Sequence, residues 1–165
     1  MTIINLTPYC GSGHPFESAR RPVGLREKEA IMLVDHINPP ELAKPSGFAH
    51  ATRFRDIVHL AGQTALTPEG TIVDGGIVAQ FRQALANVIA ALEAAGGKPQ
   101  NLLSVTIYLL DIPGYQAHAK EIGRLWRELV GEAYPAMAGI GVTALWQPEA
   151  LVEIQAVAAL DSEQP

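Results

Sequence analysis

The strongest periodic signal in the chain is an apolar stripe that recurs every three or four residues between positions 77 and 92. It consists of Ile77, Phe81, Leu85, Val88, Ile89 and Leu92. This spacing places the side chains on one side of a helix, and Gly96-Gly97 supplies a stop signal. The sequence therefore predicts a helix from about 77 to 95, whose apolar face needs a second layer of structure to cover it.

The segments on either side of this helix have the character of strands. "FAHATRF" (48–54) and "DIVHLAGQTAL" (56–66) are rich in apolar residues and meet at Arg55-Asp56, which predicts a hairpin. After the helix, "NLLSVTIYLLD" (101–111) alternates in polarity and predicts a strand. Its apolar face is expected to carry Leu103, Val105, Ile107 and Leu109, and its other face Ser104, Thr106 and Tyr108.

A second helical stripe runs from Tyr115 to Leu129, and two more strands are expected at about 137–145 and 150–159. This order predicts an α+β domain in which two helices cover one face of a mixed sheet. The uncovered face would carry Glu153, Gln155, Val157 and Ala159 of the last strand. Much of that face is too apolar to be left in water, so we expect a homo-oligomer with ligand clefts between subunits.

The first 35 residues differ from the rest, because Gly, Ser, Pro and Arg interrupt any periodicity. We interpret residues 1–35 as an irregular N-terminal extension and residues 36–165 as a single α+β domain. The end of the extension, "LREKEAIMLVDHI", could form a short helix or a short strand. The extension itself could be an oligomer contact, a simple addition or an artefact of the start site.

Charge and cysteine content argue against several function classes. The net charge is −5 at pH 7 and no run of Lys or Arg offsets it, so nucleic-acid binding is not expected. Cys10 is the single cysteine, and no Cys/His group has the spacing of a zinc site, so neither a disulfide nor a metal site is expected. The absence of a signal-like start and of long apolar stretches predicts a cytoplasmic protein that does not enter a membrane.

Six segments together resemble the YjgF/Rid family, the reactive-intermediate deaminases, over about residues 36–160. They are "GFAHA" (47–51), "IVHLAGQTAL" (57–66), "QFRQALANVIAALEAAGG" (80–97), "VTIYLLD" (105–111), "YPAMAGIGV" (134–142) and "ALVEIQAVA" (150–158). The resemblance implies a chorismate-mutase-like α+β fold, a homotrimer with three clefts between subunits, and the hydrolysis of enamines or imines without cofactor or metal.

The family's functional positions are only partly preserved. The arginine that binds the substrate carboxylate in the deaminase branch is Met137 here, and the family's tyrosine is Phe48. The family's glutamine and serine positions hold His50 and Ala61. The resemblance is retained at Gly62 and Gln63, and at Glu153, which matches the carboxylate near the proposed catalytic water.

These positions define the expected site. Glu153 would act as a base through water and His50 would exchange protons, whereas Phe48, Gly62, Gln63, Met137 and Ala138 would contact the ligand. Backbone amides near Gly62 or in residues 136–140 could stabilise the adduct. Without the guanidinium, the substrate should be less anionic than a 2-imino acid. Two alternatives are a ligand-binding trimer without catalysis and an endoribonuclease, which the acidic charge disfavours.

Overall fold

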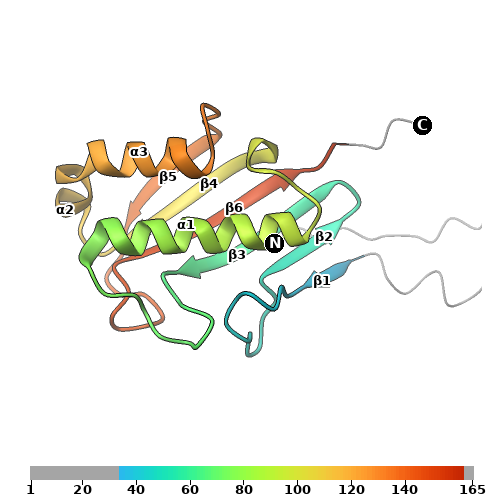
Figure 1. The fold of residues 1–165 in the computed structure, drawn as a ribbon, viewed down its shortest axis with the longest axis horizontal. Coiled ribbons are helices and arrows are strands. Elements are labelled where there is room, and N and C mark those ends of the chain that lie inside the picture. Colours follow the sequence, from blue (N-terminus) through green and yellow to red (C-terminus); the bar gives the residue numbers. More distant parts are fainter. Residues whose placement is uncertain (1–33, 162–165) are drawn as a thin grey trace, which may run out of the picture. The chain divides into compact units, whose positions relative to one another are not determined.

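The computed structural model describes residues 34–161, which form one six-stranded sheet and a layer of helices. The proposed N-terminal extension lies almost entirely outside the described residues. In chain order the elements are β1 (Asp35–Ile37), β2 (Ala51–Phe54), β3 (Ile57–Thr64), α1 (Gly76–Ala94), a 3₁₀ turn (Pro99–Asn101), β4 (Leu102–Leu109), α2 (Ile112–Ala117), α3 (Ala119–Leu129), β5 (Ala136–Gly141) and β6 (Val152–Ala159). Figure 1 shows their arrangement.

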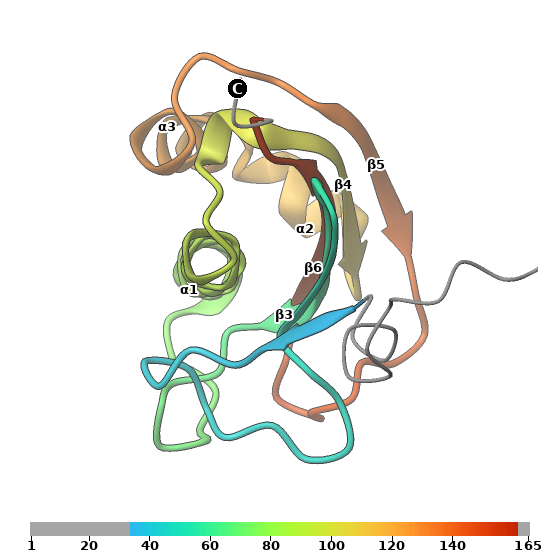
Figure 2. The same ribbon diagram turned by 90° about the vertical axis from the view of Figure 1, so that its right-hand side faces the viewer.

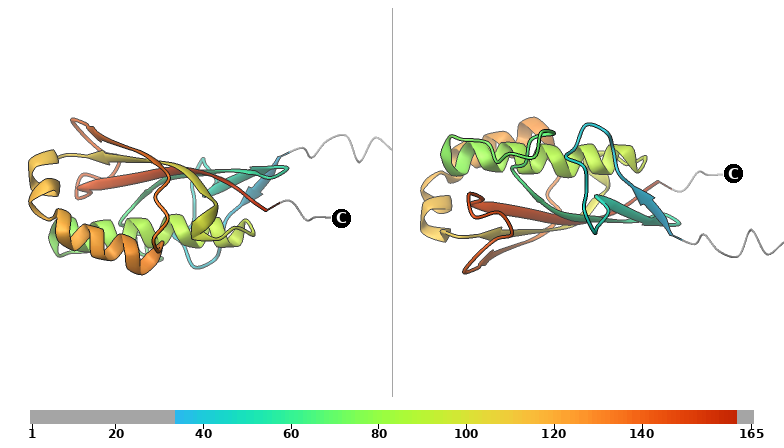
Figure 3. Two further views of the ribbon diagram at one scale, coloured as in Figure 1. Left: turned by 90° about the horizontal axis from the view of Figure 1, so that it is seen from above. Right: turned by 90° about the horizontal axis from the view of Figure 1, so that it is seen from below.

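The sheet is mixed, as the sequence predicts. Its strand order is β1-β2-β3-β6-β4-β5, and all neighbours are antiparallel except β4 and β5, which run parallel. The last strand of the chain, β6, therefore lies between β3 and β4 at the centre of the sheet. Figures 2 and 3 show that the helices cover one face of the curved sheet. The predicted α+β architecture is confirmed.

The core lies between α1 and the centre of the sheet. The predicted stripe on α1 is buried, with Phe81, Leu85, Val88 and Leu92 at most 1% exposed. Ala156 and Ala158 of β6 and Val58 and Leu60 of β3 belong to the same cluster. The helix ends where the sequence predicts, because Gly96 adopts a left-handed φ of 88° that favours glycine.

The two-residue hairpin is also confirmed, since Phe54 pairs with Ile57 and Arg55-Asp56 form the turn. The expected face of β4 is wrong at one position. Leu103 is 51% exposed and Leu102 is buried instead, because the pairing of β4 with β6 shifts between Leu102 and Ser104. Such a bulge inserts one residue and reverses the side-chain alternation on that side of it. Val105, Ile107 and Leu109 point into the core as predicted.

The second predicted helix is divided into two, so the helical layer contains three α-helices rather than two. The helix is interrupted at His118, whose φ of −103° and ψ of 14° are not helical. Helix α2 starts earlier than expected, because the Asp111 side chain accepts a hydrogen bond from the Gly114 backbone N–H and caps it. The strand expected at 137–145 also ends early, at Gly141.

The uncovered face of the sheet carries the side chains that the sequence predicts. Ser104, Thr106 and Tyr108 of β4 and Glu153 and Val157 of β6 are half-buried, and Gln155 is exposed. The Tyr108 hydroxyl donates to Gln155 Oε1 across the strands at 3.1 Å. No helix within residues 34–161 is long and apolar enough to cross a membrane.

Candidate functional site

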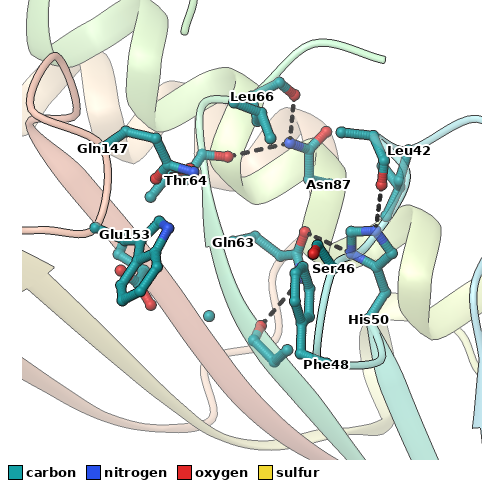
Figure 4. A pocket seen from close by; sticks show the side chains of 14 residues that line it. Leu42, Ser46, Phe48, His50, Gln63, Thr64, Leu66, Asn87, Gln147 and Glu153 are labelled. Carbon is teal, nitrogen blue, oxygen red and sulfur yellow. Dashed lines mark hydrogen bonds between the residues drawn. The ribbon is translucent and has the colours of Figure 1, made fainter. Parts of the chain in front are cut away.

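A pocket of about 400 Å³ lies where β3, β6 and the loops before β2 and β6 meet. Its apolar lining residues are Leu42, Ala43, Phe48, Ala61, Leu66 and Trp146, and Gly62 lines it with backbone atoms. Its polar lining residues are Ser46, His50, Gln63, Thr64, Asn87, Gln147 and Glu153. Figure 4 shows Glu153 on one side of the pocket and Phe48, His50 and Gln63 on the other. Five of the seven predicted site residues therefore line a single pocket.

Glu153 is the acidic group of this pocket. It lies on β6, pointing to the uncovered face, and its side chain is half-buried. Burial raises the pKa of the Glu153 carboxyl above its ordinary value. No Lys, Arg or His side chain within residues 34–161 forms an ion pair with this carboxylate. A partly desolvated carboxyl group without a neutralising partner is a candidate for proton transfer.

Gly62 makes room for this carboxylate. A Cβ atom at position 62 would lie 1.8 Å from Glu153 Oε1 and 2.8 Å from its Cδ, far inside ordinary contact. The pairing of β3 with β6 shifts between Leu60 and Gln63, which brings the Gly62 backbone close to Glu153. Glycine at this position is therefore favoured by the close approach of the Glu153 side chain rather than by its φ angle.

His50 lies on the opposite side of the pocket and is only 4% exposed. Its Nε2 lies 2.8 Å from the Ala43 carbonyl oxygen, and its Nδ1 lies 3.2 Å from Gln63 Oε1. Because a carbonyl can only accept, Nε2 carries a proton and donates it to Ala43. The Phe48 ring packs edge-on against the imidazole, with 5.2 Å between centroids. Contacts with Ala43, Gln63 and Phe48 thus hold the His50 ring in place within its own chain.

Several pocket residues were not predicted from the sequence. Asn87 of α1 donates to the carbonyls of Thr64 and Leu66, at 3.1 and 2.9 Å, and so ties the end of β3 to the helix. The Thr64 hydroxyl donates to Gln147 Oε1 at 3.0 Å. Trp146, next to Gln147, is 91% exposed at the pocket. Asn87 could have been predicted from the sequence, because it is a polar residue inside the apolar stripe of a helix.

Met137 and Ala138 do not belong to this pocket. They lie on β5, at the edge of the sheet, where Met137 pairs with Val105 and shares its helix-facing side. Met137 lines a smaller cavity of about 210 Å³ with Trp126 and Tyr134, whose rings stack 6.0 Å apart. Within one chain the structure therefore does not bring these two predicted residues to Glu153.

No Lys or Arg lines the pocket within the described part of the chain. The Arg53 guanidinium donates to the carbonyls of Arg55 and Ala95, away from the pocket, and Arg124 is exposed on α3. Neither replaces the arginine that the family resemblance leads one to expect at position 137. Among residues 34–161, no three His, Cys, Asp or Glu side chains lie close enough together to hold a metal ion.

Comparisons with known proteins agree with the fold. Residues 40–160 match a family model described as endoribonuclease L-PSP. A RutC family protein of Pyrococcus horikoshii is 35% identical over 117 residues, which cover 70% of this chain and 89% of that protein. A 2-iminobutanoate/2-iminopropanoate deaminase of Capra hircus is 32% identical over 102 residues, covering 61% and 71%.

Solved structures agree as well. The structure of a probable translation initiation inhibitor from Rhodopseudomonas palustris superposes with a TM-score of 0.70 at 25% identity, covering 78% of this chain and 99% of that one. The matched family model spans more than half of the chain, and the same region carries the six sequence segments and the mixed sheet. The chain therefore belongs to the endoribonuclease L-PSP family, also called the YjgF/RutC/Rid family.

Proposed function

We propose that this protein is a cofactor-free hydrolase that converts an enamine or imine of a small metabolite to a carbonyl compound and ammonia. The observation that carries the proposal is the Glu153 carboxyl group, which lies half-buried against Gly62 in a pocket of about 400 Å³ and has no ionic partner within residues 34–161. The similarity to 2-iminobutanoate/2-iminopropanoate deaminases adds support for this reaction class.

In the proposed reaction, water adds to the carbon of the C=N bond and forms a carbinolamine. The Glu153 carboxylate accepts a proton from this water and passes it to the imine nitrogen. It then accepts the proton of the carbinolamine hydroxyl and passes it to the same nitrogen, so that the C–N bond breaks, ammonia leaves and the C=O bond forms. An enamine first tautomerises to its imine. A raised pKa makes the Glu153 carboxylate a stronger proton acceptor than an ordinary glutamate, which suits its role as the base. Proton transfer of this kind contributes about 10²- to 10⁴-fold to rate.

The substrate is proposed to carry no carboxylate next to the imine. A guanidinium–carboxylate contact is worth roughly 1.5 to 3 kcal/mol, and position 137 holds methionine. The pocket lining within residues 34–161 offers a carboxylate and no cation. An anionic ligand would thus meet a like charge at Glu153, whereas a neutral or protonated ligand would not.

The site is proposed to be completed in a homotrimer. The uncovered sheet face bears few charges, and Glu153 lies on it beside the pocket, so a neighbouring chain packed there would close the cleft. Ala138, which pairs with Thr106 and so shares the uncovered face, would then be able to reach the pocket of a neighbouring chain from the edge strand β5, whereas Met137 faces the helices. We propose a cytoplasmic location with this assembly, based on the single cysteine of the sequence.

The test uses imines generated in situ by an amine oxidase or an amino-acid oxidase. The rate of ammonia release with the protein is compared with the rate in buffer, for neutral and for carboxylate-bearing imines. We expect acceleration for the neutral imines and a fall of about 100-fold or more in Glu153→Gln. Glu69→Gln, which removes an exposed carboxylate from a turn, is the matched control and should keep full activity. No acceleration with any imine would refute the proposal.

A second candidate is a ligand-binding trimer without catalysis. It is favoured by His50, because both of its ring nitrogens are engaged by Ala43 and Gln63 and so leave it little freedom to exchange protons. Ligand binding without turnover in the natural chain would support this candidate, whereas full turnover in Glu153→Gln would contradict it and indicate a base other than Glu153. RNA cleavage is not proposed, since the net charge of −5 opposes phosphate binding. Cleavage by a rigorously purified sample at moderate salt would overturn that view.

A further inference from the structure

Trp146 has an unusual combination of exposure and anchoring. Its side chain is 91% exposed, yet it lines the same pocket as Glu153. The segment that carries it, residues 142–151, is held at two places. Gln147 accepts a hydrogen bond from Thr64, and the buried Gln80 side chain donates to the Glu149 carbonyl and accepts from the Leu151 N–H, at 2.9 and 2.7 Å. The indole is therefore attached to a backbone that is tied to β3 and α1.

A second aromatic ring borders the pocket from another part of the chain. Phe48, in the loop before β2, is 52% exposed and packs on one side against His50. Figure 4 shows it across the pocket from Glu153. Aromatic rings bind flat groups by stacking, and their faces attract cations. Trp146 and Phe48 thus offer a ligand exposed aromatic surface that the described part of the chain does not cover.

The charge of the pocket adds a second requirement. Glu153 is the only carboxylate among the described lining residues, and they include no Lys or Arg. A ligand that fills this pocket therefore gains from a neutral or positively charged nitrogen near Glu153 and loses from a carboxylate. The exposed aromatic rings and the single carboxylate thus favour one class of ligand, which combines a flat ring with an amine or imine nitrogen.

We propose that Trp146 is a specificity-determining residue, which stacks on the aromatic ring of an uncharged or cationic arylalkyl amine or imine whose nitrogen lies at Glu153. This inference rests on the proposed function, in that it assigns a substrate class to the same pocket. The competing occupant of the indole is a neighbouring chain in the oligomer, and the experiment separates the two.

Binding is measured first with three compounds of similar shape and different charge: 2-phenylethylamine, 2-phenylacetamide and phenylacetate. The chain has two tryptophans, so Trp126→Phe leaves Trp146 as the fluorescent reporter. We expect solvent-exposed emission in the free protein and a blue shift when the amine or the amide binds. Calorimetric titration of the unaltered chain gives the same affinities without relying on that variant, and the amine should bind about tenfold or more tighter than phenylacetate.

The variants test whether the indole supplies the preference. Trp146→Ala should weaken 2-phenylethylamine about tenfold, and Trp146→Phe should lose about threefold or less. Butylamine, which has no ring, should bind equally to all three proteins. The proposal is overturned by tight phenylacetate binding, by an unchanged affinity in Trp146→Ala, or by buried Trp146 emission that no ligand alters, since that emission would mean that a neighbouring chain covers the indole.

The outcomes also distinguish this inference from the proposed function. Ring-dependent binding without ammonia release would leave the role of Trp146 intact and reject the hydrolase. Hydrolysis that accelerates equally for alkyl and arylalkyl imines, in both the natural chain and Trp146→Ala, would leave the hydrolase intact and reject the role of Trp146.

Discussion

Replacing Gly62 by alanine would test the role of Glu153 through its position rather than its chemistry. The new Cβ would lie 1.8 Å from Glu153 Oε1, 2.8 Å from Cδ and 3.1 Å from Cγ. The carboxylate would have to move by about 1.5 Å to reach an ordinary contact distance. It is the far end of a flexible side chain on the uncovered face, so the movement is possible without unfolding the strand.

The expected magnitudes differ for stability and for activity. Overpacking of this kind costs about 1 to 3 kcal/mol, and part of it is offset because alanine is less costly than glycine in a strand by about 0.5 to 1 kcal/mol. We therefore expect a folded protein with a net loss of about 1 to 2 kcal/mol. A displacement of about 1 Å in a catalytic group can reduce the rate about 100-fold, so activity should fall far more than stability.

The assay is a double-mutant cycle on imine hydrolysis, with unfolding in urea measured in parallel. The four proteins are the natural chain, Gly62→Ala, Glu153→Gln and the double variant. If alanine acts by displacing the carboxylate, the double variant should be no slower than Glu153→Gln alone. Gly123→Ala is the matched control, because its Cβ would meet nothing closer than 3.7 Å on α3, and it should keep full activity.

Two results would refute this reasoning. If Gly62→Ala keeps the natural rate, the position of the carboxylate does not matter for the reaction. If the two single substitutions multiply in the double variant, they act independently, and Gly62 contributes by some means other than making room for Glu153.

Three further predictions concern stability. Phe81→Ala should cost about 3 to 5 kcal/mol in urea unfolding, because this ring is 1% exposed, and a loss under 1 kcal/mol would contradict the described core. Gln80→Leu should cost about 2 kcal/mol and speed amide exchange at Leu151, since it removes both hydrogen bonds to the segment 142–151. Burial raises the pKa of Glu153, so its charge opposes folding above that pKa and has no effect below the ordinary carboxyl range. Glu153→Gln should thus melt higher at pH 7, and the difference should vanish in acid.

The sequence by itself determined the elements whose signals are local. The stripe of α1, its end at Gly96 and the turn at Arg55-Asp56 depend on a few neighbouring residues, because helix periodicity and turn conformation act over one or two turns of chain. The family motifs likewise pointed to Phe48, His50, Gly62, Gln63 and Glu153, which line one pocket. A motif preserves such residues in order even though it does not show where they lie.

Tertiary structure decided what depends on contacts between distant segments. The bulge that exposes Leu103 comes from pairing with β6, about fifty residues later in the chain, and no local pattern records it. Trp146 reads as an ordinary loop residue until Gln80 and Thr64 hold its loop beside Glu153. The motif placed Met137 in the expected site, but its parallel pairing with β4 turns its side chain toward the helices. Side-chain direction in a sheet is set by register, and register is a property of the folded chain.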